Sequence, residues 1–349
     1  MKMKFTRKEF LHTLAAGMGA VAFNKFLTAC SRAEFTAESI PTRAPLATTE
    51  KLRELESDAA RINASPLPEE TTIGSPDLVV ARGTEGTDVP PEELVRRTLL
   101  ALGGMERFVP QGANVVIKPN ICIGYHEYKY AATTNPWVVG ALVKLCMEAG
   151  AGSVSVMDYP FGGPAEQAYV KSGIEEQVRA AGGEMVAMPQ FKFVPTEIPQ
   201  GVELQQCDIF DDVLKADVLI NVPIAKHHSL ARLTLGMKNL MGVIRDRPSI
   251  HRNLGQRLAD LTSRVYPTLT VVDAVRILVA NGPTGGNLDD VRKIDTVIAS
   301  PDIVAADSYA STLFGLQPNE LTYIQAGTAM GLGRSELDSL KIEEIAVGT

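Results

Sequence analysis

Short apolar runs alternate with segments of helical length from about residue 77 to the C-terminus. Three of the runs read NVVIK at 114–118, SVSVMD at 153–158 and LTVVD at 269–273, and segments such as 136–148 begin at a proline and end near a glycine. A strand that is apolar on both faces belongs inside a sheet that is covered on both sides, which is typical of parallel sheets. The alternation therefore predicts an α/β fold with a mostly parallel sheet, covered by helices on both faces in three layers.

Three regions of the chain differ in composition. Residues 1–30 resemble an export signal, residues 31–75 are polar with scattered prolines, and residues 76–349 carry the α/β pattern. The second region is typical of a flexible tether. The third region is expected to be one α/β domain, with one or two lobes, because a chain that is 45% hydrophobic can bury a large core.

Two motifs in the first 30 residues predict export. TRKEFL at 6–11 resembles a twin-arginine signal with lysine in place of the second arginine, and LTAC at 27–30 resembles a bacterial lipobox, in which Cys30 would be lipidated. A general secretory signal and a short membrane anchor are the alternatives, although the apolar run at 14–23 is short for a membrane span. We therefore expect a protein of the cell envelope or periplasm that touches the membrane through its lipid anchor only, and the export route stays open.

The net charge of the chain limits its partners. Lysine and arginine number 34 and aspartate and glutamate 41, which gives a formal net charge of −7. An acidic surface repels the phosphate backbone, so general nucleic-acid binding is excluded. The composition leaves the oligomeric state open.

The cysteines argue against a metal cluster encoded locally in the sequence. Apart from Cys30 the chain has Cys122, Cys146 and Cys207, which are far apart and form no C-x-x-C motif. A zinc or iron–sulfur motif is therefore absent. One disulfide with one thiol, or three thiols, both fit this spacing.

Polar side chains follow several of the predicted strands. They are Lys118, Asn120, Asp158, Asn221, Lys226 and Asp273. In open α/β sheets, ligands bind outside the carboxyl ends of the strands, so these residues are expected to share one crevice. The alternative for the two aspartates is that they cap helices or turns.

The segment 221–252 concentrates positive charge in an acidic chain. It holds six lysines and arginines against one aspartate, and three of the five histidines. Its apolar residues recur at helical spacing, so we expect a helix whose positive N-terminus faces a ligand. The segment predicts a site for a small anion, and a solvated basic face is the alternative.

Roles follow from the chemistry of these side chains. Lys226 and Lys238 would hold carboxylate or phosphate oxygens, and His228, or its neighbour His227, would transfer a proton because the pKa of imidazole lies near neutral. His228, Lys226 and Lys238 are thus the catalytic candidates. Asp273 or Asp158 would orient the imidazole or bind a metal, for which His227, His228 and Asp158 are the candidate ligands. No particular metal or other cofactor is identified.

Several motifs stand in a characteristic order. They are KPN at 118–120, NVP at 221–223 followed by Lys226 and His228, GMKNLMG at 236–242, VDA at 272–274 and NGP at 281–283. Over roughly residues 77–345 the chain resembles the "domain of unknown function 362" family. Asn239 and Asn281 lie in these motifs and complete the ligand-binding candidates, with Lys118, Asn120, Asn221 and Asp273.

The resemblance implies an α/β domain without a settled activity. Some members of the family carry an added ferredoxin-like module with clustered cysteines, and this chain lacks that module. More distantly, Lys-x-His followed by Gly-x-Lys is similar to a stretch of lactate-racemase-like proteins, which act on small hydroxy acids. We expect an exported lipoprotein enzyme that binds a small anionic substrate or cofactor for redox or isomerisation chemistry; the alternative is an envelope lipoprotein that binds an anion or metal without catalysis.

Overall fold

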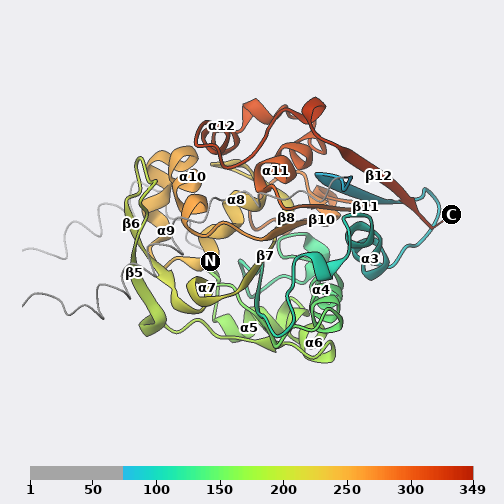
Figure 1. Cartoon of the computed structure of the whole chain (residues 1–349), viewed down its shortest axis with the longest axis horizontal. Coiled ribbons are helices and arrows are strands. Elements are labelled where there is room, and N and C mark those ends of the chain that lie inside the picture. The colour runs from blue at the N-terminus through green and yellow to red at the C-terminus, as the bar shows by residue number, and fades with distance from the viewer. Residues whose placement is uncertain (1–73, 349) are drawn as a thin grey trace, which may run out of the picture. The chain divides into compact units, whose positions relative to one another are not determined.

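Ten strands join into one sheet in the computed structural model, which describes residues 74–348 (Figure 1). Along the sheet they are β12 (Ile342–Val347), β1 (Leu78–Gly83), β11 (Val291–Ser300), β10 (Leu269–Leu278), β7 (Val218–Val222), β2 (Asn114–Pro119), β3 (Ser153–Val156) and β4 (Glu184–Met185), with β8 (Ile224–His228) beside β10 and β9 (Arg232–Thr234) beside β8. β11 is antiparallel to both of its neighbours and β9 is antiparallel to β8, while the other pairs are parallel. The predicted mostly parallel sheet is confirmed.

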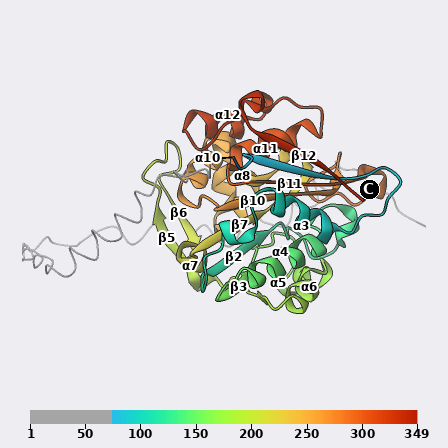
Figure 2. The same cartoon turned by 45° about the vertical axis from the view of Figure 1, so that its right-hand side comes forward.

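Helices cover both faces of this sheet. One face carries α3 (Pro91–Ala101), α4 (Pro136–Glu148), α5 (Ala165–Lys171) and α6 (Ile174–Ala180), and the other carries α7 (Asp211–Lys215), α8 (Gly236–Asn239), α9 (Arg247–Ile250), α10 (Leu254–Arg264), α11 (Ile303–Thr312) and α12 (Thr322–Ala329). Figure 2 shows α4, α5 and α6 on one side and α8, α11 and α12 on the other. Because the strands are apolar on both faces, helices cover both faces of the sheet, which gives three layers.

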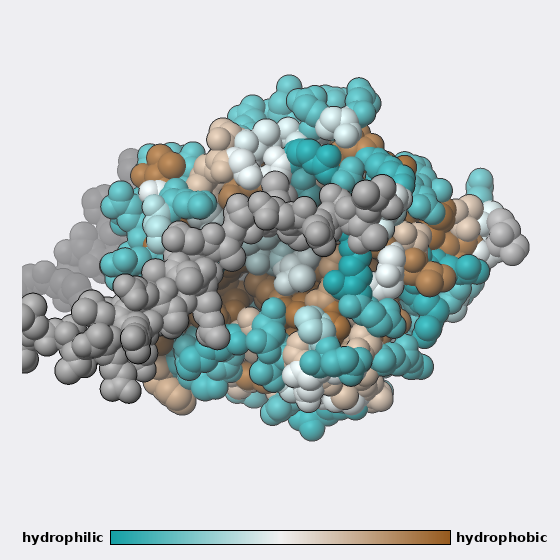
Figure 3. All heavy atoms as spheres, in the orientation of Figure 1, coloured by the Kyte–Doolittle hydropathy of each residue, from teal (hydrophilic) through white to brown (hydrophobic). Residues whose placement is uncertain are grey.

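The strands are apolar throughout because each face has its own core. Leu78 and Val80 of β1 pack into the core under α10, α11 and α12, while Val79 and Ala81 pack into the core under α3 and α4. Alternate residues of a strand point to opposite faces, so a strand between two cores cannot contain polar residues at every second position. On the outside, the face in Figure 3 is largely hydrophilic with separate hydrophobic patches.

A separate two-stranded antiparallel hairpin lies beside the main sheet. It consists of β5 (Phe193–Glu197) and β6 (Gln206–Phe210). Phe193 and Phe210 stand opposite each other in its register, with ring centroids 5.3 Å apart. The two strands and the turn that joins them occupy residues 193–210.

The N-terminal predictions lie outside the described residues. This applies to the export signal at 1–30 with Cys30 and to the tether as far as residue 73. Between residues 74 and 348, no helix is both long and apolar enough to cross a membrane. The cysteines of the described part, Cys122, Cys146 and Cys207, are free thiols, which decides between the two possibilities that the sequence left open.

The helix expected in the segment after β9 is largely absent. α8 has only four residues, and a 3-10 helix, η4 (Leu240–Val243), follows it. Every residue from 233 to 244 is buried. Since the segment is buried on all sides, the spacing of its apolar residues does not indicate a helix. The N-terminus of α8 is also capped, because the Asp307 carboxylate accepts from the amides of Gly236 (2.6 Å) and Met237 (2.9 Å). The prediction that a helix N-terminus faces the ligand is therefore wrong.

Candidate functional site

A cavity of about 660 Å³ lies where β2, β3 and β8 end. Its lining includes the basic side chains of Lys118, Lys226, Lys238, Arg245, Arg247, His228 and His251. Among the described lining residues one acidic side chain, Asp158, faces them. Such an excess of positive charge in a hollow favours a negatively charged ligand.

The sheet brings Lys118 and Asp158 to this cavity from neighbouring strands. Lys118 is the penultimate residue of β2 and Asp158 follows β3, and these two strands pair in parallel. Their carboxyl ends therefore open at the same edge of the sheet. This is the geometric reason that residues 40 positions apart meet.

β8 presents alternate side chains to the cavity. Lys226 and His228 line it, whereas His227 between them does not. His227 instead accepts a hydrogen bond at Nδ1 from the amide of Gly282 (3.0 Å). The side-chain alternation of a strand thus excludes His227 as the proton-transfer residue in this cavity.

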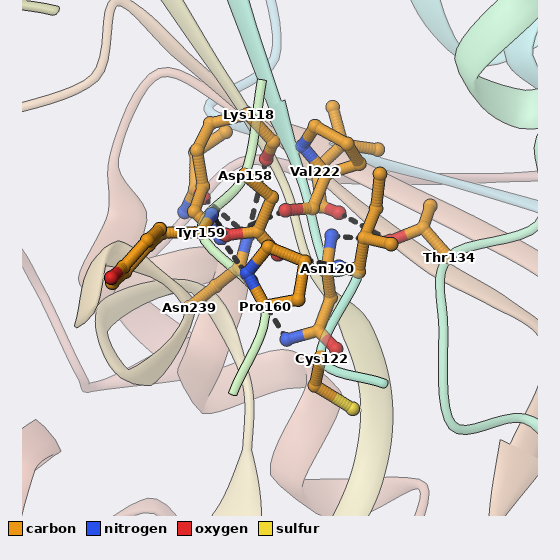
Figure 4. A network of polar contacts seen from close by, with 12 residues as sticks. Lys118, Asn120, Cys122, Thr134, Asp158, Tyr159, Pro160, Val222 and Asn239 are labelled. Atoms are coloured by element: carbon orange, nitrogen blue, oxygen red, sulfur yellow. Dashed lines mark hydrogen bonds and ion pairs between the residues drawn. The ribbon is translucent and has the colours of Figure 1, made fainter. Parts of the chain in front are cut away.

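All three N–H donors of the Lys118 ammonium have acceptors within the protein. Its ammonium lies 2.8 Å from Asp158 Oδ1, 2.8 Å from the carbonyl of Pro119 and 3.0 Å from Asn239 Oδ1, and the side chain is 1% exposed. An ammonium has three N–H donors, so none remains for a ligand. Figure 4 shows Lys118, Asp158 and Asn239 pointing toward one another in this network.

The Asp158 carboxylate also has several partners within the protein. Besides the ion pair, its carboxylate accepts hydrogen bonds from the backbone amides of Ile121 and Tyr159. A buried carboxylate with an ion pair and two amide donors is a satisfied structural anion. It holds together the loop after β2 and the loop after β3.

Lys226 is engaged without a carboxylate. Its ammonium donates to the carbonyls of Ala132 (2.6 Å) and Pro283 (3.0 Å) and to Asn120 Oδ1 (3.0 Å). Cys122 Sγ lies 3.3 Å from the same nitrogen. Neutral oxygens thus satisfy the donors, and among residues 74–348 the positive charge of Lys226 has no counter-ion, so it contributes to the field inside the cavity.

Lys238 differs from the other two buried lysines. It is 8% exposed, and its ammonium has no hydrogen bond or ion pair within the described part of the chain. Burial, and then the charges of Lys226, Lys118 and Arg247, lower the pKa of Lys238 to about 8. A lysine that lines a cavity, is largely buried and has no acceptor among the described residues can bind an anion or react as an amine.

His228 has a fixed tautomer. Its Nδ1 accepts from the backbone amides of Leu230 (3.1 Å) and Ala231 (3.3 Å), so the proton of the neutral ring sits on Nε2. Burial, followed by the charges of Lys238 and Lys226, lowers the pKa of His228 to about 3. The prediction of a pKa near neutral is wrong, and His228 is a neutral hydrogen-bond donor rather than a base.

Arg247 closes one side of the cavity. Its guanidinium lies over the ring of Tyr159, 4.7 Å from the centroid, and donates to the carbonyls of Tyr159 and Pro160. A guanidinium has five N–H donors, so some remain for a ligand. Arg245, by contrast, pairs with Asp208 outside the cavity.

Two of the predicted asparagines connect the lysines. Asn239 Oδ1 accepts from Lys118 Nζ and from Asn120 Nδ2 (2.9 Å). Asn120 Oδ1 accepts in turn from Lys226. Both asparagines line the cavity, and they set the distance between the two engaged lysines rather than carrying charge.

Three predicted ligand-binding residues do not line the cavity. Asn221 is fully buried and bonds the carbonyl of Gly236 and the side chain of Asn239. Asp273 accepts from the amides of Asn135 (2.7 Å) and Val275 (3.0 Å), and burial raises the pKa of Asp273 to about 6. Asp273 therefore supports the start of α4, as the capping alternative predicted.

Asn281 lies on an exposed turn. Its backbone φ is +54°, and its side chain donates to Asp290 Oδ2 (2.8 Å). Asparagine tolerates this left-handed conformation better than most residues. The NGP motif therefore contributes a turn, and from it only Pro283 reaches the cavity.

The candidate metal ligands do not converge. Within residues 74–348, no three side chains of His, Cys, Asp or Glu come together as a metal site. Asp158 is held by Lys118, and the Nδ1 atoms of His227 and His228 accept backbone hydrogen bonds. The residues predicted as metal ligands thus have other partners.

Three residues of the site were missed at the level of the sequence. Arg247 belongs to the basic segment but had no assigned role, and Cys122 was considered only as a possible disulfide partner. Asp307 caps α8 from a different helix, 71 residues away from Gly236. The KPNIC sequence, in which Cys122 follows closely on Lys118, was the available signal for Cys122.

The cavity lies in the part of the chain that matches a known protein family. The family described as "Domain of unknown function (DUF362)" matches residues 115–312. The thylakoid-associated protein sll1697 of Synechocystis is 29% identical over 252 residues, covering 68% of this chain and 74% of that protein. All the cavity residues lie within the matched region.

Two solved structures are similar to this chain at a low level. The lactate racemase apoprotein of Thermoanaerobacterium thermosaccharolyticum has a TM-score of 0.43 at 12% identity, covering 71% of this chain and 58% of that one. A protein of Thermotoga maritima has a TM-score of 0.36 at 10% identity, covering 64% of this chain and 59% of that one. The chain thus spans less than two thirds of either structure.

Proposed function

The chain belongs to the DUF362 family, and we propose that its domain is an enzyme that binds a small anionic substrate or cofactor in the cavity at the ends of β2, β3 and β8. One observation carries this proposal: Lys238 lines the cavity, is only 8% exposed, and its ammonium has no hydrogen bond or ion pair to another residue within 74–348. An anion at this position would supply the missing acceptor.

The ligand contacts follow from the donors that the protein leaves free. They are the ammonium of Lys238, the Nε2–H of His228 and the remaining guanidinium N–H groups of Arg247. These donors fit a carboxylate or a similar oxyanion. Lys118 and Lys226 contribute through their charges, because their own donors are occupied.

Lys238→Met is expected to weaken the binding of sulfate at least tenfold, which corresponds to about 1.4 kcal/mol. Methionine keeps most of the apolar length of the side chain and removes the unpaired charge. Isothermal titration calorimetry with sulfate measures the effect. Lys144→Met is the matched control, since Lys144 is 62% exposed on α4. Equal affinity in the wild type and Lys238→Met would remove the proposed site.

The same titration has an expected pH dependence. Since the pKa of Lys238 is lowered to about 8, sulfate affinity should fall as the pH rises through that value and the ammonium is lost. His228, with a pKa of about 3, stays neutral from pH 5 to 9 and adds no step near pH 6.5. Sulfate remains a dianion throughout, so the change in affinity belongs to the protein.

The cellular location is part of the proposal. TRKEFL at 6–11 and LTAC at 27–30 support export and lipidation at Cys30. Labelled palmitate should enter the wild-type protein and be absent from Cys30→Ala in a bacterial host. An unlabelled, fully soluble wild-type protein would contradict lipidation. Binding of anions without any turnover would instead identify an anion-binding envelope lipoprotein.

A further inference from the structure

We propose that Lys238 forms a Schiff base with the carbonyl carbon of a small oxo acid bound in the cavity. The substrate class is then a carboxylate that carries an aldehyde or ketone group. This inference rests on the proposed anion site and names the substrate class and the bond that forms there.

The first support is the difference among the three buried lysines. The donors of Lys118 meet a carboxylate, a carbonyl and an amide oxygen, and those of Lys226 meet two carbonyls and an amide oxygen. Either amine would have to give up these bonds before its lone pair could react. Lys238 gives up none within the described part of the chain, so its nitrogen is the one prepared for attack.

The second support is the electrostatic surroundings of that nitrogen. Lys238 is 8% exposed, and it lines the same cavity as Lys226, Lys118 and Arg247, whose positive charges lower its pKa. Burial and neighbouring positive charge both favour the neutral amine, and at pH 7 a pKa of about 8 leaves roughly a tenth of the molecules with a free lone pair. An ordinary surface lysine has far less neutral amine at this pH.

The third support is the set of donors around the amine. Arg247 has free N–H groups for a carboxylate, and the neutral His228 ring offers its Nε2–H. When the amine attacks, the carbonyl oxygen gains negative charge, and the N–H of a neutral imidazole can donate a hydrogen bond to that oxygen without transferring its proton. The cavity therefore provides for the carboxylate, the carbonyl oxygen and the nucleophile separately.

The chemistry balances without another reactant. The Lys238 lone pair forms a C–N bond while the carbonyl π electrons move to oxygen, and a proton passes from nitrogen to that oxygen to give a carbinolamine. The proton that the Lys238 ammonium released to water before the attack returns to this hydroxyl, which leaves as water while the nitrogen lone pair forms the C=N bond, and a protonated imine remains. The protonated imine carries one positive charge, as the original ammonium did. The charge on the Lys238 nitrogen is therefore the same before and after the reaction.

Reductive trapping tests the proposal. The purified protein is incubated with glyoxylate, pyruvate or 2-oxoglutarate and sodium borohydride, and the adduct is located by peptide mass spectrometry. We expect stoichiometric modification of Lys238 with at least one of these acids and a yield at least tenfold lower at any other lysine. Sulfate should lower the yield by competition, and acetate should give no adduct.

Variants separate the amine from its charge. Lys238→Arg keeps a cation but lacks a nucleophilic amine, and should give no adduct, whereas Lys144→Arg should behave as the wild type. Thermal unfolding shows whether Lys238→Arg folds; if it does not, the location of the adduct in the wild type decides. Sulfate binding by the wild type without trapping of any of the three acids would overturn the Schiff base and keep the anion site. Absence of both sulfate binding and trapping would overturn both proposals.

Discussion

Lys118→Met is expected to lower the free energy of unfolding by about 3–5 kcal/mol. The substitution removes the cation that pairs with Asp158 at 2.8 Å, and the carboxylate stays buried at 3% exposure with only backbone amides as donors. It also frees Asn239 Oδ1 from one of its two donors. Urea denaturation followed by circular dichroism measures the loss.

Two further variants separate the buried pair from lysine in general. Lys144→Met removes an exposed lysine that lies 3.9 Å from Glu148, and should change the stability by less than about 0.5 kcal/mol. Lys118→Met combined with Asp158→Asn should be more stable than Lys118→Met alone, because no unpaired carboxylate remains buried at this position. A loss in Lys118→Met as small as that in Lys144→Met would show that the ion pair contributes little.

Gly242→Ala is expected to destabilise the protein by about 3 kcal/mol or more and to abolish sulfate binding. A Cβ at this position would lie 1.9 Å from Asp158 Oδ1 and 2.5 Å from Lys118 Nζ. These atoms cannot move aside cheaply, since both side chains are buried and bonded to each other. The methyl group would separate the ion pair and displace the wall of the cavity.

Gly140→Ala is the control for this change. Its Cβ would meet Gln177 Cβ at 3.0 Å within the packing of α4 on α6, so a small shift should keep the effect within about 1 kcal/mol. In an Asp158→Ala background, Gly242→Ala should cost less than in the wild type, because its closest clash is removed. Additive losses in that double variant would contradict the steric explanation.

The fold was largely predictable from the pattern of apolar residues. NVVIK, SVSVMD and LTVVD are strands β2, β3 and β10 or their ends, because a strand buried on both faces leaves a continuous apolar run in the sequence. The segment 233–244 shows the limit of this reasoning. It is buried on every side and its apolar spacing resembles that of a helix, yet only α8 and η4 form there.

The site was predictable in its composition but not in the roles of its members. Lys118, Lys226 and Lys238 were named from strand ends and from the basic segment, and they line one cavity. The residues next to these lysines in the sequence do not predict their hydrogen-bond acceptors. Some of the acceptors belong to Asp158, Ala132 and Pro283, which lie in distant loops. That Lys238 lacks such a partner is a property of the packed loops.

The amino-acid sequence by itself determined the parallel sheet, the places where its strands end and the excess of positive charge near those ends, because hydrophobicity and charge are properties of each residue. The three-dimensional arrangement was needed to show that Lys238 has no partner among residues 74–348, which face of β8 lines the cavity and why the pKa of His228 falls to about 3. Those outcomes depend on burial and on atoms brought together from distant loops, since hydrogen bonds and desolvation act over a few ångströms in space and not along the chain.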